Sequence, residues 1–358
     1  MKLQEIVTRL EKVITVFGKS PSATLPSVFI WGPPGIGKST VVKNLAEKLN
    51  IGFVDVRLSQ LAPTDLRGLP SIDKQSKVLE WIAPKFLPRE RDSKGILFLD
   101  EFNMATGSLQ GIAQQLILDR CVGDYILPEG WVIVGAGNRS SDRAAVNEMP
   151  SPVANRFLHF DATAELSEFK DLVFNHFGFS DDTSAAIAGF LNFRPEMLHK
   201  NSNKRTNMPA WPSPRTWQMA GHLHDADLDV AHAIGGEAAT QFKAFLKLKT
   251  QLPDLQAILD GERVAPLDTG DASIVSSLVS SLLAHSKTCE HYTNALSWLL
   301  TNKKITEDYF GLFVKDMLIK LDDDKALMAK VVTKIMRDKS TKEFMTKYKN
   351  LVTSFGSK

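Results

Sequence analysis

A glycine-rich stretch, GPPGIGKST at residues 32–40, carries residue types that can bind a phosphate group and a metal ion. Its spacing of Gly32, four residues, Gly37, Lys38 and Ser39 fits a phosphate-binding loop without mismatch. Glycines let backbone N–H groups point at phosphate oxygens, and the lysine would reach the β- and γ-phosphates. The serine hydroxyl would bind Mg²⁺, a cation that prefers oxygen ligands. Such a loop would bind a nucleoside triphosphate, and ATP is the expected one. The residues expected to contact it are Gly32, Pro33, Pro34, Gly35, Ile36, Gly37, Lys38, Ser39 and Thr40.

Two carboxylates, Asp100 and Glu101, follow the apolar run ILFL at 96–99, where a buried strand would leave its sheet. Asp100 is expected to hold Mg²⁺ together with Ser39, and Glu101 is expected to polarise an attacking water as a general base. The alternative is a strand that simply ends in a solvated acidic turn. The phosphate-binding loop upstream favours the catalytic interpretation.

Asn138 is a third candidate, because it ends the apolar run WVIVGAG at 131–137. A neutral polar side chain at this point could hydrogen-bond the γ-phosphate or orient the water. Asparagine also commonly opens turns. The presence of the other two motifs favours a role in the site.

The elements that must position these residues alternate between apolar runs and helical patterns. Runs at 27–31, 51–58, 94–100, 131–138 and 156–161 predict strands. Their alternation with helices predicts an α/β fold, in which a parallel sheet has helices on both faces. Functional side chains should then gather at the carboxyl ends of the strands. From about residue 165 onward, only helical patterns are evident.

Composition limits the classes of function. Of 358 residues, 43% are hydrophobic and 23% are charged, as in a globular protein with a real core. The formal net charge of +2 does not indicate a nucleic-acid binder by bulk electrostatics. Cys121 and Cys289 are far apart, which favours a reduced, cytoplasmic setting without a disulfide framework. The N-terminal segment has the pattern of an amphipathic helix rather than a signal peptide, and no stretch is long enough to span a membrane.

The order of five motifs resembles that of AAA+ ATPases, and more narrowly the MoxR branch with its CbbQ, NorQ and GvpN type activators. The motifs are GPPGIGKST, ILFLDEF, GAGNRSSD, SPVANRF and WPSPRT, and the resemblance covers roughly residues 1–235. It implies an AAA+ nucleotide-binding α/β core at 1–164, a helical lid with the sensor 2 residue at 165–240, and a helical C-terminal region at 241–358.

The resemblance also implies roles for three polar residues. Asn138 corresponds to the sensor 1 residue, Arg156 to the arginine finger that reaches a neighbouring subunit's γ-phosphate, and Arg215 to the sensor 2 residue. Arg139 and Arg143 lie near the same edge and are alternatives to Arg156. For Arg215 there is also a local reason, since Ser213 is a suitable N-cap and Pro214 a suitable first helical residue.

As a MoxR-type protein, the chain would form a homo-oligomer, typically a hexameric ring, that hydrolyses ATP to remodel or activate a partner protein. The partner of such proteins often carries a von Willebrand factor A domain. Two insertions fit this pattern, at 64–89 and at 121–130, where hairpins are expected. The alternative is a ring that acts on nucleic acid, as helicase and loader branches do. The only basic loop, at 199–205, is short, which favours the protein client.

Overall fold

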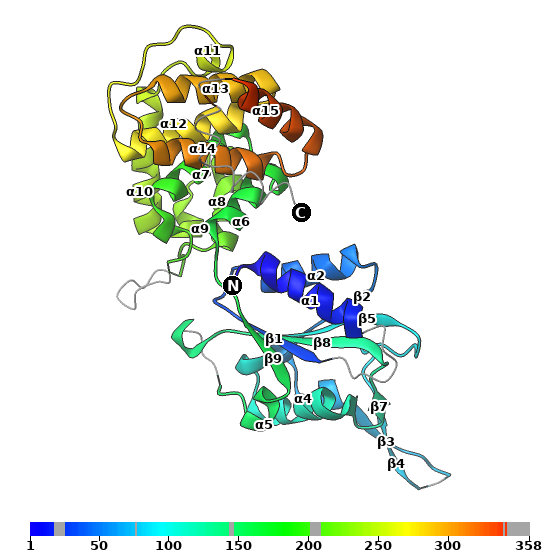
Figure 1. The fold of residues 1–358 in the computed structure, drawn as a ribbon. Helices are drawn as coiled ribbons and strands as arrows, with labels where there is room; N and C mark the ends of the chain where they lie inside the picture. Colours follow the sequence, from blue (N-terminus) through cyan, green and yellow to red (C-terminus); the bar gives the residue numbers. More distant parts are fainter. Residues whose placement is uncertain (18–25, 76, 143–146, 201–208, 339–340, 342–358) are drawn as a thin grey trace. The chain divides into compact units, whose positions relative to one another are not determined.

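The computed structural model describes all residues except 18–25, 76, 143–146, 201–208, 339–340 and 342–358. The chain divides into two compact units, Met1–Ala164 and Glu165–Lys358. The first unit is built on a parallel sheet, and the described residues of the second are helical (Figure 1). The predicted fold class, an α/β fold with a parallel sheet followed by a helical region, is confirmed.

The described part of the first unit alternates strands with helices and short 3₁₀ turns. In chain order the elements are α1 (Leu3–Phe17), β1 (Ser27–Trp31), α2 (Lys38–Lys48), β2 (Gly52–Arg57), η1 (Leu58–Gln60), α3 (Pro63–Arg67), β3 (Leu69–Ile72), β4 (Leu79–Ile82), β5 (Lys94–Asp100), η2 (Phe102–Met104), α4 (Gly107–Asp119), β6 (Cys121–Val122), β7 (Tyr125–Ile126), β8 (Gly130–Gly137), η3 (Ser140–Asp142), α5 (Ser151–Ala154) and β9 (Phe157–Asp161).

Five of these strands form one parallel sheet in the order β2-β5-β8-β1-β9. The strand β8 therefore lies between β1, which leads into the glycine-rich loop, and β5, which ends at the acidic pair. Because all five strands run in the same direction, their carboxyl ends meet at one edge. Asn138, directly after β8, is thus placed between Lys38 and Asp100.

Side chains of the central strands alternate between two apolar layers. On β5, Ile96 and Phe98 belong to the layer that packs with α1 and α2. Leu97 and Leu99 belong to the layer that packs with α4 on the other face. Figure 1 shows these helices on opposite sides of the sheet. Burial on both faces explains why the strand is a continuous apolar run instead of an alternating one.

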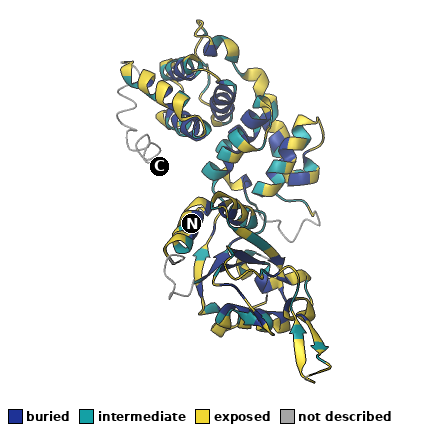
Figure 2. Cartoon of the chain, turned by 90° about the vertical axis from the view of Figure 1, so that its right-hand side faces the viewer, coloured by how far each residue is buried: buried dark blue, intermediate teal, exposed yellow. Residues whose placement is uncertain are grey.

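Two antiparallel hairpins, β3–β4 and β6–β7, fill the insertions predicted at 64–89 and 121–130. The β3–β4 hairpin projects from the first unit in Figure 1 and is largely exposed in Figure 2. The backbone N–H of Trp81 donates to Asp124 Oδ2 at 2.5 Å, which ties the two hairpins together. The guanidinium of Arg67 lies 4.2 Å from the centre of the Trp81 ring, a cation–π contact at the base of the longer hairpin.

All secondary-structure elements in the described residues of the second unit are helices or helical turns, joined by loops. They are α6 (Leu166–Asp171), the π-helical turn η4 (Leu172–His176), α7 (Asp181–Phe193), η5 (Pro195–Met197), α8 (Pro214–Asp225), α9 (Ala231–Ile234), α10 (Gly236–Leu246), η6 (Lys247–Gln251), α11 (Leu255–Leu259), α12 (Ala272–His285), α13 (Cys289–Thr301), α14 (Glu307–Lys320) and α15 (Lys325–Arg337).

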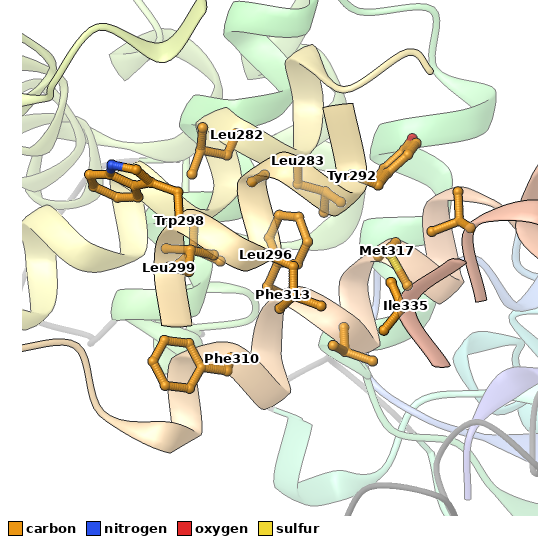
Figure 3. Packing of buried hydrophobic residues seen from close by; sticks show 14 of the residues in the cluster. Leu282, Leu283, Tyr292, Leu296, Trp298, Leu299, Phe310, Phe313, Met317 and Ile335 are labelled. Carbon is orange, nitrogen blue, oxygen red and sulfur yellow. The ribbon is translucent and has the colours of Figure 1, made fainter. Parts of the chain in front are cut away.

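The core of the second unit is centred on α12, which is buried from Ile274 to Ala284. A helix buried on all sides must be apolar or small around its whole circumference, and α12 meets this with alternating leucine, valine and serine. Figure 3 shows Leu282 and Leu283 of α12 packed among Leu296, Phe313 and other side chains of α13 and α14. The helix α7 also packs along α12. Among the described residues, no helix has the length and apolar character needed to cross a membrane.

A buried polar network ties four helices of this unit together. The ammonium of Lys170 on α6 pairs with Asp316 on α14 and donates to Asn192 Oδ1 on α7 at 2.9 Å. The amide of Asn192 donates to Asp316 Oδ2 and to Ser280 Oγ on α12, each at 3.2 Å. The side chains of Lys170 and Asp316 are 3% and 1% exposed, so neither charge has access to water. Burial lowers the pKa of Lys170, and the facing carboxylate opposes that shift.

Substitution of Asp316 with alanine is expected to lower the free energy of unfolding of the second unit by about 3–5 kcal/mol. The reason is that Lys170 would stay buried without its counter-ion. Urea unfolding followed by far-ultraviolet circular dichroism measures this change. The matched control is Lys249→Ala, which removes an ion pair with Asp182 whose side chains are both 55% exposed. This control substitution should lower the free energy of unfolding by about 1 kcal/mol or less. Equal losses for the two variants would contradict a stabilising role for the buried pair.

Candidate nucleotide-binding site

The glycine-rich loop connects β1 to α2 and turns through two left-handed residues. Gly35 has φ of 81° and Gly37 has φ of 100°, values that residues with a Cβ rarely adopt. No side chain caps the start of α2 at Lys38. The N–H groups of its first turn and the positive end of the helix dipole are therefore suited to an anion.

Lys38 links this loop to the end of β8. Its Nζ donates to the backbone oxygens of Gly32 at 2.5 Å and Pro33 at 3.1 Å, and to Asn138 Oδ1 at 3.1 Å. A half-buried ammonium held by carbonyl and amide oxygens, at the mouth of a glycine-rich loop, is well placed to meet a phosphate group. The loop and Asn138 are thus parts of one site.

Asp100 lies beside this lysine at the end of β5. Burial raises the pKa of the Asp100 carboxyl, a hydrogen bond from the backbone N–H of Glu101 opposes the rise, and the negative charge of Asp55 adds to it. The positive charge of Lys38 also lowers this pKa. Crowding of carboxylates around a single ammonium is the electrostatic setting that a divalent cation would relieve. Proton binding to Asp100 at low pH should therefore compete with Mg²⁺.

The donor set at this point suits Mg²⁺ with a bound nucleotide. Within the described parts of the chain, no group of three or more His, Cys, Asp or Glu side chains could hold a metal ion. Mg²⁺ commonly takes only one or two protein ligands and completes its octahedron with phosphate and water oxygens. The hydroxyl of Ser39 and the carboxylate of Asp100 fit that requirement.

Glu101 is held in an uncommon backbone conformation. Its φ is 53°, in the left-handed region, which costs about 1–2 kcal/mol for a residue with a Cβ. The Ser59 hydroxyl donates to Glu101 Oε2, and the backbone N–H of Glu101 donates to Asp100 Oδ1 at 2.8 Å. Strain of this kind is often found at functional sites. Ser59 is not among the predicted site residues, because a serine in a turn after a strand carries no distinctive sequence signal.

Asn138 is buried, and a second asparagine fixes its backbone. The N–H of Asn138 donates to Asn103 Oδ1 at 3.2 Å, and Asn103 Nδ2 donates to the oxygen of Asn138 at 2.6 Å. These two bonds set the position from which the Asn138 side chain reaches Lys38. Asn103 is 2% exposed. Asn103 is not among the predicted site residues, although its position two residues after the acidic pair is a signal in the sequence.

The predicted arginines occupy different environments. Arg156 follows α5, is exposed, and its side chain makes no hydrogen bond or ion pair with the described residues. Arg156 precedes Phe157, which pairs with Ser27, the first residue of β1. The glycine-rich loop begins only after Trp31, the fifth and last residue of that strand. At about 3.3 Å per residue, this separation is roughly 13 Å along the strands. Arg156 thus lies toward the amino end of the sheet, away from its own chain's Lys38.

The other three predicted arginines differ from Arg156 in their surroundings. Arg139 is engaged by Asp161 and by the backbone of Ala162, and Arg143 lies outside the described residues. Arg215 belongs to the second unit, where it is exposed on the first turn of α8. The predicted N-cap of that helix is confirmed, since Ser213 and Thr216 form a reciprocal capping box with Pro214 in the first turn.

The part of the chain that carries this site is similar to a known family of domains. Residues 27–157 match the family described as AAA domain (dynein-related subfamily). The matched segment contains the glycine-rich loop, the acidic pair and Asn138, and it extends from β1 to the start of β9. Residues 27–157 of the first unit are therefore similar to an AAA domain.

Individual relatives are distant. A protein of Acanthamoeba polyphaga mimivirus, provisionally named replication factor C small subunit, is 25% identical over 120 residues, which are 32% of this chain and 34% of that protein. The chain thus spans about a third of the length of this curated relative. Among solved structures, a protein of Cytophaga hutchinsonii provisionally described as an ATPase is 18% identical with a TM-score of 0.33, covering 45% of this chain and 46% of its own. The RuvB Holliday junction branch migration motor of Thermotoga maritima is 17% identical with a TM-score of 0.40, covering 76% of this chain and 81% of its own.

Proposed function

We propose that the protein is a Mg²⁺-dependent AAA+ ATPase. The observation that supports this most strongly is the grouping of Lys38, Asp100, Glu101 and Asn138 at one edge of the sheet, with β8 between the two motif-bearing strands. Bound ATP would supply the phosphoryl group, and Mg²⁺ would neutralise its developing charge. Lys38 and the loop N–H groups hold phosphate oxygens, Glu101 takes a proton from water, and Asn138 orients the reacting groups.

Substitution of Lys38 with alanine tests the binding part of this proposal. It removes a charged donor from the phosphate-binding loop, and two or more charge-assisted hydrogen bonds are together worth about a hundredfold or more in affinity. Titration with a fluorescent ATP analogue in the presence of Mg²⁺ measures the loss. Lys94→Ala, at the exposed start of β5, is the control and should bind as the unmodified protein does. Unchanged affinity in Lys38→Ala would contradict a nucleotide site at this loop.

We further propose that the protein is a MoxR-type homo-oligomeric motor, typically a hexameric ring, that remodels or activates a partner protein with a von Willebrand factor A domain. In this proposal residues 165–240 form a lid in which Arg215 serves as the sensor 2 residue, and 241–358 form a C-terminal helical region. The exposed β3–β4 hairpin is an observation that supports the proposal of a protein partner. Its apolar side chains Leu69, Ile72, Val78, Leu79 and Ile82 are each more than half exposed. Clustered exposure of this kind is typical of interaction surfaces.

The second candidate is an ATPase directed at nucleic acid. The observation in its favour is the name of the viral relative, replication factor C small subunit. An apolar hairpin and a net charge of +2 favour the protein client instead. Measurement of ATPase activity with single-stranded and duplex DNA separates the two, since a nucleic-acid motor would show strong stimulation that declines steeply with salt.

A further inference from the structure

Arg139 directly follows Asn138 and is held by partners within the first unit. Its Nε donates to Asp161 Oδ1 at 2.9 Å, and its Nη2 donates to the backbone oxygen of Ala162 at 3.0 Å. Its backbone N–H donates to Asp142 Oδ2 at 2.7 Å, which fixes the start of the side chain. The guanidinium therefore joins the end of β8 to the residues that follow β9.

The Arg139 side chain has three partners: Asp161, the oxygen of Ala162 and, in an ion pair at 3.8 Å, Asp142. The bond to the oxygen of Ala162 is the one that reaches the residues next to the glycine-rich loop. The side chain of Asp161 is 69% exposed, so its ion pair with Arg139 is screened by water. Ala162 is fully buried. A charged donor to a buried carbonyl makes a stronger hydrogen bond, and loss of that donor leaves the carbonyl without compensation.

Ala162 also touches the glycine-rich loop directly. Its N–H donates to the oxygen of Trp31, the residue before the loop, at 2.7 Å. A Cβ at Gly32 would lie 3.0 Å from the oxygen of Ala162, so the two backbones approach closely. Two residues further on, the chain leaves the first unit at Ala164. Ala162 is thus the point where the loop, the Arg139 side chain and the exit of the chain meet.

We propose that Arg139 is a positioning residue that couples the nucleotide site to the backbone at Ala162, where the chain leaves the first unit. This inference depends on the ATP site proposed above. The connection runs from Lys38 to Asn138 Oδ1, along the chain to Arg139, and through its Nη2 to the oxygen of Ala162. When Asn138 exchanges its bond with Lys38 for one with a phosphate, Arg139 and Ala162 move with it. Arg139 is accordingly engaged in its own subunit and is not the residue that acts on a neighbour.

Hydrogen exchange of residues 157–165, with and without a non-hydrolysable ATP analogue and Mg²⁺, tests the coupling. In the unmodified protein the analogue should change exchange at Ala162. In Arg139→Gln, which keeps a donor but loses the charge, the analogue should bind within about threefold of the normal affinity while the exchange response falls about tenfold or more. Arg139→Lys keeps the charge and should retain part of the response. The matched control is Arg91→Ala, an exposed residue of the same unit without a polar partner among the described residues.

A full exchange response in Arg139→Gln would overturn the coupling. Loss of analogue binding and response together in both Arg139 variants would also overturn it, because the residue would then serve binding or folding. The outcome for the unmodified protein separates this inference from the proposed function. Failure to bind the analogue would refute the ATP site, whereas binding without any response at 157–165 would refute only the coupling.

Discussion

Replacement of Glu101 with glutamine is expected to lower the ATP turnover number about 10²- to 10⁴-fold while ATP still binds. Glutamine has nearly the same shape, and its amide can keep the contact with the Ser59 hydroxyl, but it cannot accept a proton from water. The backbone bond that holds residue 101 against Asp100 is unaffected, since it involves the main-chain N–H. Phosphate release under saturating Mg²⁺ and ATP measures the turnover number.

Glu90→Gln provides the matched control for that experiment. Glu90 is exposed in the segment before β5, and its carboxylate makes no hydrogen bond or ion pair with the described residues. Its turnover number should equal that of the unmodified protein. Full turnover in Glu101→Gln would contradict the assignment of Glu101 as the general base. Loss of ATP binding in the same variant would instead indicate that the carboxylate serves the metal shell.

Replacement of Arg156 with alanine is expected to lower the turnover number about 10³- to 10⁵-fold and to leave ATP affinity nearly unchanged. A guanidinium stabilises charge that develops only as the phosphoryl group transfers, so its loss affects the rate more than the binding. Arg156→Lys should restore little, because a single ammonium cannot match the planar fork of arginine. Parallel measurements of phosphate release and of analogue binding separate the two quantities.

A normal turnover number in Arg156→Ala would contradict the role of Arg156. Arg139 is bound within its own chain. Arg143, the remaining alternative, would then be the next residue to substitute. Arg91→Ala again serves as the control for removal of an exposed positive charge from the first unit.

Much of the first unit could be predicted from local patterns. The run from Ile96 to Leu99 is apolar without interruption, and the structure buries both of its faces. The order of the strands could not be predicted in this way. Local periodicity contains no information on which strand lies beside which, so the position of β8 between β1 and β5 appears only in the structure.

In the candidate site, too, residues in short sequence motifs could be predicted, whereas contacts between distant residues could not. Lys38, Ser39, Asp100 and Glu101 were recognisable because each belongs to a short contiguous motif. The partners of Asn103 and Ser59 could not be predicted, because they lie 35 and 42 residues away in the sequence. The anchoring of Arg139 to Ala162 likewise spans 23 residues. Such residues position the groups that do the chemistry, and only the fold brings them together.

We propose that each catalytic site combines Glu101 of one subunit with Arg156 of its neighbour. Glu101→Gln subunits can be mixed with Arg156→Ala subunits, because each variant is expected to hydrolyse ATP slowly alone and supplies the residue that the other lacks. ATP hydrolysis is expected to rise on mixing and to be greatest near equal amounts of the two variants. Absence of hydrolysis at every ratio, in mixtures shown by native mass spectrometry to exchange subunits, would contradict the shared site.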